Sequence, residues 1–316
     1  MKRSSLVAGS LLVARALGAQ GLPSHQPLNP TSTARTGLYA EPYRAFDPAG
    51  GWRTGVSVEY GNAIESDTNG TSSYLLDAEL MRTSLRLGRD LSPRVFAGLE
   101  LSAVGAYAGF ADGFFVWYHR LIHYTQPERA ARPENEFGYR FSLPNGTRIT
   151  RSPSALSLGD ARVTLGRRHG ESLQSVLSLT LPTATGGYGR GVPSVSTVQT
   201  VHIELSPRVF YEGTAGAGFT PRHGDLSPWQ RTLFVSASTG FGFRLWGSQS
   251  VFGSFFYHSP DYHGTGLSSL DRHELTADFG WLARGRDGRD WYVSFTEDLG
   301  PGDPGIDLIL RIGRTW

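Results

Sequence analysis

Hydrophobic and polar residues alternate one by one along most of the chain, which is the period of a β-strand. In the segment 233–246, Leu233, Val235, Phe241 and Phe243 share one face, and Ser and Gly recur between them. The same alternation recurs in 171–182, 272–285 and 305–316. One face of each predicted strand is therefore apolar, and the other is small, polar or charged.

Turn-forming residues separate about twelve such segments. The predicted strands lie near 52–61, 74–88, 93–106, 155–168, 171–182, 198–205, 208–219, 230–246, 249–259, 272–285, 289–299 and 305–316. Short connections such as 206–207 alternate with longer ones such as 183–197, as in outer-membrane barrels with short periplasmic turns. We therefore expect an all-β protein, a closed antiparallel transmembrane β-barrel of about 12 strands with both termini in the periplasm.

The segment 74–88 breaks the simple alternation. Leu76 and Leu80 share one face of a regular strand, whereas Leu85 and Leu87 share the opposite face. A β-bulge near Met81 would bring both sets to one side. We therefore expect a bulge at that position.

The alternative to a membrane barrel is a soluble sandwich or a lipocalin-like barrel, which has the same period with the two faces exchanged. Three features favour lipid. The apolar last strand ends in Trp316, as the assembly signals of outer-membrane barrels do. The polar faces are rich in Gly and Ser and carry charges of both signs. Aromatic residues lie at strand ends as in an interfacial girdle, including Trp52, Trp246, Trp281, Trp291 and Tyr292. We therefore predict an integral protein of the bacterial outer membrane.

The N-terminus carries the pattern of a secretory signal. Lys2 and Arg3 precede a short apolar run at 6–14 and the small residues of 16–19. We predict a signal peptide over 1–19, with a frayed soluble N-terminus as the alternative. Residues 20–50, rich in Pro, Ser and Thr, form a predicted periplasmic or plug segment before a barrel domain at 51–316.

Composition excludes several function classes. The 316 residues contain no Cys, and Lys2 is the sole Lys, so disulfides, thiol catalysis and a downstream Schiff-base lysine are excluded. The net charge of +2 argues against nucleic acid as a partner. No Gly-x-Ser-x-Gly motif and no phospholipase-like His/Ser/Asn motif occurs. We therefore expect neither an enzyme nor a cofactor, with a lipid-acting outer-membrane enzyme as the least favoured alternative.

The connection 107–154 is long enough to have structure of its own. Asp112 is suited to cap a helix that reaches about residue 125, and aromatic and aliphatic residues follow helical spacing within it. This stripe would pack against the protein's own rim, cover the barrel mouth or lie against the outer leaflet. His119 and His123 are one turn apart, but no third ligand is evident, so we expect no metal.

Charged residues on the predicted inward faces are candidates for lining the lumen. They are Asp77, Glu79, Arg82, Arg86, Glu100, Asp160, Arg162, Asp278 and Arg311. One interpretation is a selectivity lining for a small aqueous pore. The other is a lattice of salt bridges that fills a narrow barrel.

Short motifs spread over the chain resemble an uncharacterised bacterial outer-membrane family, domain-of-unknown-function family 3187. They are Pro27–Pro30, Gly109–Phe114 followed by His119, Leu158–Arg162 and Leu181–Thr183. The chain departs from the family pattern at Ala106–Gly109, where a Gly pair is expected. The resemblance implies an outer-membrane barrel without an established activity. Asp112 and His119 match the family motif, with no role implied.

These observations predict passive passage or binding of a small solute, whose identity the sequence does not give. The alternative is a structural or adhesive surface protein, and a lumen packed solid with paired Arg and carboxylates would favour it. The expected partners are outer-membrane lipid and, through the C-terminal strand, the barrel-assembly machinery.

Overall fold

The computed structural model describes residues 21–33, 39–48, 51–121, 132–186, 188–285, 289–299 and 308–315. Its strands are β1 (Trp52–Thr68), β2 (Ser73–Asp90), β3 (Val95–Tyr107), β4 (Gly138–Ser142), β5 (Arg148–Thr150), β6 (Ser154–Leu158), β7 (Ala161–Arg168), β8 (Leu173–Leu181), β9 (Ser194–Ser206), β10 (Val209–Phe219), β11 (Leu233–Arg244), β12 (Gln249–His258), β13 (Glu274–Arg284), β14 (Asp290–Asp298) and β15 (Leu308–Thr315). The helical elements are α1 (Pro30–Thr33), α2 (Asp112–Leu121), the 3-10 turn η2 (Ser227–Trp229) and α4 (Ser268–Asp271).

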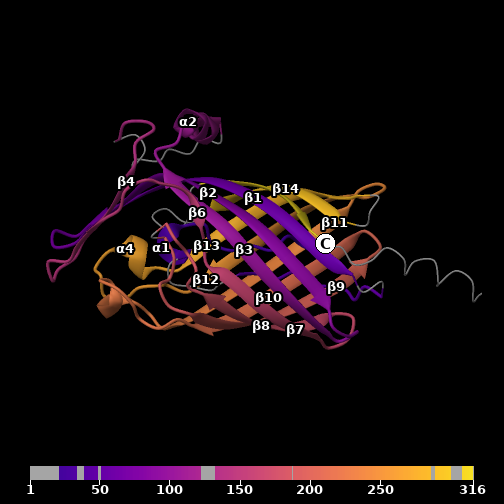
Figure 1. The fold of residues 1–316 in the computed structure, drawn as a ribbon. Coiled ribbons are helices and arrows are strands. Elements are labelled where there is room, and N and C mark those ends of the chain that lie inside the picture. Colours follow the sequence, from indigo (N-terminus) through magenta and orange to yellow (C-terminus); the bar gives the residue numbers. More distant parts are fainter. Residues whose placement is uncertain are drawn as a thin grey trace, which may run out of the picture.

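Twelve strands form a closed antiparallel ring. The order is β1, β2, β3 and then β7 to β15, and β15 pairs with β1 to close the wall (Figure 1). Strand β6 continues the line of β7 along β3, and β4 and β5 extend the outer part of β2 as a hairpin. The predicted barrel and its strand number are thus confirmed.

The two ends of the barrel differ. Turns of a few residues join β2 to β3, β7 to β8, β9 to β10 and β11 to β12, and we call this the short-turn end. The opposite end carries the segments that contain α2, η2 and α4, and we call it the long-loop end.

The apolar faces of the strands point away from the lumen. Large hydrophobic side chains stay exposed along the wall, among them Val56, Val58, Leu165, Leu177, Val235, Phe241, Phe243, Phe279, Val293, Phe295, Leu310 and Ile312. Neighbours of opposite parity, such as Ser57, Ser178 and Ser294, are buried. A soluble barrel would have the reverse arrangement, so this polarity is that of a wall in contact with hydrocarbon. Tyr292 has the parity of Ser294 and is buried inside the barrel, so its expected place in the interfacial girdle is wrong.

The predicted bulge near Met81 is wrong. Strand β2 pairs with β1 in unbroken register from Ser73 to Arg89. Leu76 and Leu80 therefore point inward and are buried, whereas Leu85 points outward and is exposed. The apolar residues of β2 therefore change from the inward face to the outward face along the strand, and no extra residue is inserted.

An apolar core lies inside the barrel at the long-loop end. It includes Leu76 and Leu80 of β2, Phe141 of β4, Leu270 of α4 and, from the residues ahead of β1, Leu28. Among the residues described, no helix is long and apolar enough to cross a bilayer.

Candidate functional site

Residues 21–33 and 39–48, which we call the plug segment, run up the lumen and back. Near its start, Leu22 packs on Phe210 and Leu282 at the short-turn end. Asn29 Nδ2 donates to Glu65 Oε1 at 2.5 Å in the outer part of β1. The two arms meet at a bridge between His25 and Ala40.

The returning arm ends where it began. The amide of Arg44 donates to Gln174 Oε1 at 2.8 Å, and Tyr43 Oη donates to the carbonyl of Gly170 at 3.0 Å in the turn between β7 and β8. Both ends of the plug segment therefore lie at the short-turn end. The predicted division of the chain at residues 19 and 50 stays a prediction, and residues 1–19 lie outside the described residues.

Arginines of the wall hold the plug segment through its backbone carbonyls. Arg311 Nη1 donates to Ser24 O at 2.9 Å, and Arg82 Nη1 donates to Pro27 O at 2.7 Å. Buried guanidinium groups need acceptors, and carbonyl groups of the plug segment supply them. The plug segment thus completes the hydrogen bonding of the lumen.

Six of the predicted lumen residues lie inside the barrel and are paired there. Glu100 Oε2 accepts from Arg86 Nε and Glu100 Oε1 from Arg162 Nη2, both at 2.6 Å. Arg311 pairs with Asp278. Arg82 pairs with Glu59, a partner that the sequence analysis did not single out.

The inward placement of Asp77 and Glu79 is wrong. Both lie on the outward face of β2, because the register without a bulge gives them the opposite parity to Arg82. They are nevertheless buried, since residues on either side of α2 cover them: Arg132 Nε donates to Asp77 at 2.5 Å, and the amide of Phe110 donates to Glu79 at 2.9 Å.

Helix α2 lies against the outside of the wall (Figure 1). Asp112 Oδ1 accepts from Asn62 Nδ2 of β1 at 2.7 Å, and His119 Nε2 lies 3.6 Å from Glu297 Oε1 of β14. Phe115 is buried. Phe110, Phe114, Trp117 and Leu121 are exposed on the insertion.

Some predicted features cannot be placed. His123, the end of the predicted helix near residue 125 and Trp316 lie outside the described residues. Within the described ranges, no group of three or more His, Asp or Glu side chains could hold a metal ion.

Asp160 lies in the gap between β6 and β7. Its carboxylate accepts from the amide of Ala184 at 3.1 Å and from the amide and Nη1 of Arg190 at 2.9 and 3.1 Å. It therefore fixes the Gly-rich connection after β8 against the wall instead of facing the lumen as a free charge.

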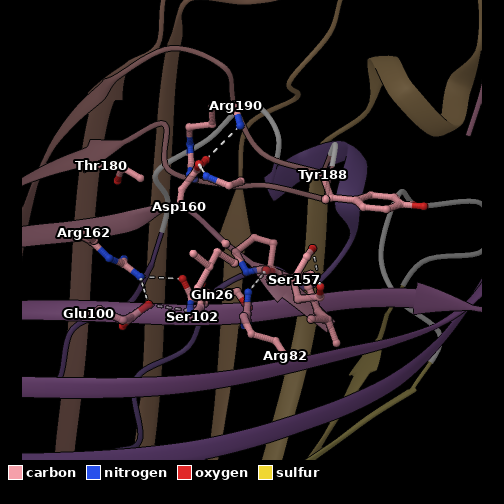
Figure 2. Close-up of a pocket in the computed structure, with 17 residues that line it drawn as sticks. Gln26, Arg82, Glu100, Ser102, Ser157, Asp160, Arg162, Thr180, Tyr188 and Arg190 are labelled. Carbon is pink, nitrogen blue, oxygen red and sulfur yellow. Dashed lines mark hydrogen bonds and ion pairs between the residues drawn. The ribbon is translucent and has the colours of Figure 1, made fainter. Parts of the chain in front are cut away.

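A cavity of about 60 Å³ lies between the plug segment and this part of the wall (Figure 2). Its lining includes Gln26, Arg82, Glu100, Ser102, Ser157, Asp160, Arg162, Thr180, Tyr188 and Arg190. Hydroxyl groups and charges of both signs share this lining with apolar side chains such as Leu28, Val104 and Leu158, so the cavity suits a small molecule that carries a polar group.

One side of the cavity is formed by a contact between the plug segment and an ion pair. Gln26 Nε2 donates to Glu100 Oε1 at 3.1 Å, and Arg162 Nη2 donates to Gln26 Oε1 at 2.6 Å. The guanidinium of Arg162 also stacks on Tyr39, 4.0 Å from the ring centroid. The sequence analysis missed Gln26 and Tyr39. Proximity to the motif Pro27–Pro30 was the only signal available.

His25 belongs to the plug segment and not to a membrane-spanning strand. Its ring packs on Phe256 at 4.6 Å between centroids. Burial, assisted by the positive charges of Arg311 and Arg82 and by His258, holds the pKa of His25 well below its ordinary value. The plug segment therefore favours the neutral imidazole.

The closed ring and its outward apolar band define an integral β-barrel protein of the bacterial outer membrane. The chain belongs to the family described as "Protein of unknown function (DUF3187)", which matches residues 62–299. The resemblance found in the sequence is thereby confirmed.

One solved structure shows the same fold. The chain is similar to the COG4313 outer membrane channel from Pseudomonas putida F1, with 13% identity and a TM-score of 0.52 over 86% of this chain and 100% of the other. It is also similar to the NanC porin, with 8% identity and a TM-score of 0.45 over 83% of this chain and 98% of the other. The Pseudomonas putida toluene transporter TodX has 6% identity and a TM-score of 0.39 over 85% of this chain and 89% of the other. At these identities the likeness concerns the fold alone. No curated protein matches the chain.

Proposed function

We propose that the protein is a plugged outer-membrane channel that binds a small polar solute in its lumen and passes it when the plug segment moves. The observation that carries this proposal is the polar cavity between the plug segment and the wall, lined by groups such as Arg162, Glu100 and Thr180. Charged rings and polar linings of this kind select solutes in aqueous pores.

The path of the plug segment supports its movement. Its contacts with the wall are hydrogen bonds, packing and the ion pair of Arg44 with Asp90, none of them covalent, and both of its ends lie at the short-turn end. It can therefore withdraw from that end without passing through the wall. In barrels of this class that end faces the periplasm.

Planar-bilayer conductance tests the proposal. We compare the full chain, a chain without residues 21–48 and a chain without residues 110–150. Removing the plug segment should raise conductance strongly, because it exposes the polar lumen to water. Removing residues 110–150 should raise conductance less, because α2 lies outside the wall and the plug segment still fills the lumen, although Phe141 leaves the apolar core of the long-loop end. Absence of conductance from every chain, with the barrel still folded by its heat-dependent gel mobility, would refute a channel.

A second candidate is a structural or adhesive surface protein with a permanently closed lumen. The pairing of Arg86, Arg162 and Glu100, and of Arg311 with Asp278, favours it. The same bilayer experiment separates the two, since a permanently closed barrel gives no solute-dependent current in its full-length form.

We also propose how the protein reaches its membrane. The apolar outward face of β15, with Leu310 and Ile312 exposed, fits recognition by the barrel-assembly machinery. The proposed role needs neither catalysis nor a cofactor.

A further inference from the structure

The Gln26 carboxamide occupies a small site that the wall builds. Its oxygen accepts from Arg162 and its nitrogen donates to Glu100, so a single planar group contacts both members of an ion pair. The side chain belongs to the plug segment, whereas Arg162 and Glu100 belong to the barrel. If the plug segment withdraws, the wall half of this site stays behind.

The wall half is held rigidly. Arg86, Glu100 and Arg162 are directly opposite one another on β2, β3 and β7, in a straight row across three neighbouring strands. Arg86 occupies the second oxygen of Glu100 at 2.6 Å, which fixes the orientation of the carboxylate. One acceptor of Glu100 and one donor of Arg162 therefore meet the plug segment at a fixed spacing.

The chemistry of this pair limits what can replace Gln26. A carboxylate would bring a second negative charge beside Glu100, and an ammonium would bring a second positive charge beside Arg162. A neutral group with an acceptor and a donor on the same carbon satisfies both partners at once. The primary carboxamide does this, as Gln26 itself demonstrates.

We infer that the Arg162–Glu100 pair is the recognition site for solutes with a primary carboxamide group, and that Gln26 occupies it as a built-in substitute. The inference rests on the proposed function, because it names the class of solute that this channel would admit. The adjoining cavity of about 60 Å³, with Ser102 and Thr180 in its lining, accommodates the rest of a small amide. A solute of this class competes with Gln26 and so favours withdrawal of the plug segment.

Chemical rescue tests the site independently of transport. The variant Gln26→Ala removes the equivalent of acetamide, so added acetamide should restore the missing hydrogen bonds and raise the thermal unfolding midpoint, since a ligand that binds only the folded state stabilises it. Acetate and ethylammonium should not do so. The further change Arg162→Gln in the Gln26→Ala background should abolish the rescue.

Thr200→Val provides the matched control. Thr200 Oγ1 donates to the carbonyl of Glu41 in the plug segment at 2.7 Å, so this variant also weakens the plug segment but leaves no amide-shaped space. Acetamide should leave its midpoint unchanged relative to the wild type. An equal response of the two variants to acetamide would show that no specific site exists.

Flux measured in proteoliposomes then separates the two proposals. Both the channel and the carboxamide site are supported if acetamide enters faster than acetate. Gln26→Ala should then raise the rate of acetamide uptake about tenfold, because it removes ~1.4 kcal/mol of the binding free energy of the plug segment. Rescue without any flux keeps the carboxamide site and refutes the channel. Flux without rescue and without preference for acetamide keeps the channel and refutes the carboxamide site.

Discussion

Arg311 on the last strand donates to the carbonyl of Ser24, 287 positions earlier in the chain, at 2.9 Å. The same guanidinium pairs with Asp278 on β13 and donates to Ser294 Oγ on β14 at 3.1 Å. A single buried side chain thus joins the plug segment to the wall and two strands of the wall to each other. Its removal should affect both the stability of the barrel and the position of the plug segment.

We expect Arg311→Leu to lower the free energy of unfolding by ~3–5 kcal/mol, because it leaves the Asp278 carboxylate buried without its cation. The double variant Asp278→Asn with Arg311→Leu should recover part of this loss, because the remaining group is neutral. Urea unfolding in lipid vesicles measures both. A single variant as stable as the double variant would contradict the assigned pairing.

The depth of the lipid-facing wall gives a second prediction. Phe279 lies in the middle of β13 and is exposed, so Phe279→Arg should cost ~2–4 kcal/mol of folding free energy in a bilayer. Trp246 is 73% exposed beside the short-turn end, so Trp246→Arg should cost only ~0–1 kcal/mol of folding free energy. Equal costs at the two positions, measured by unfolding from the same vesicles, would argue against a lipid-facing wall.

These wall residues show which part of the fold the sequence determines. Contact with hydrocarbon constrains every second residue, so the alternation places Phe241, Phe279 and Leu310 on one face. The aromatic residues at strand ends indicate that this face points outward, and the structure confirms it. Asp77 and Glu79 were placed wrongly because polarity was used to infer the face. On the outer part of β2 the insertion replaces lipid as the neighbour, and a charged residue is then stable outside the barrel.

The plug segment shows why the candidate site was only half predicted. Arg82, Arg162 and Glu100 were recognised as inward charges from the alternation. Arg162 and Glu100 contact the side chain of Gln26. The partners of Arg82 on the plug segment are backbone carbonyls, such as Pro27 O, and any residue carries a carbonyl. No pattern of side chains along residues 20–50 could therefore reveal which strand each position contacts.

The attachment of the insertion to the outer wall gives a third prediction. Gly109 has a positive φ of 79°, and a Cβ there would collide with the side chain of Glu79. Gly109→Ala should therefore release the insertion and make residues 107–135 sensitive to proteases, while the barrel stays folded. Gly146 has a similar φ of 85° but open space around it. Gly146→Ala shares the backbone strain without the collision, so the same degree of protease sensitivity in both variants would show that the contact with Glu79 is unimportant.

The last prediction concerns acid. In the inserted plug segment the pKa of His25 is well below its ordinary value, whereas a withdrawn and hydrated His25 has a pKa of about 6.5. A withdrawn plug segment therefore takes up a proton first as the pH falls below about 6.5, and the equilibrium shifts toward withdrawal by up to about tenfold per pH unit until the lowered pKa is reached. Above this range the imidazole is neutral in both states, and His25 exerts no pH-dependent effect.

Conductance measured between pH 7.5 and pH 5 tests this effect of His25. The wild-type current should increase with acidity, and His25→Phe, which keeps a ring against Phe256 but cannot bind a proton, should lose that increase. A carboxyl group of the plug segment acts in the opposite direction. Burial raises the pKa of Glu41 on the returning arm, so its protonation favours the inserted state and opposes His25. The difference between wild type and His25→Phe isolates the imidazole, and identical pH profiles would exclude it as the acid-sensitive group of the plug segment.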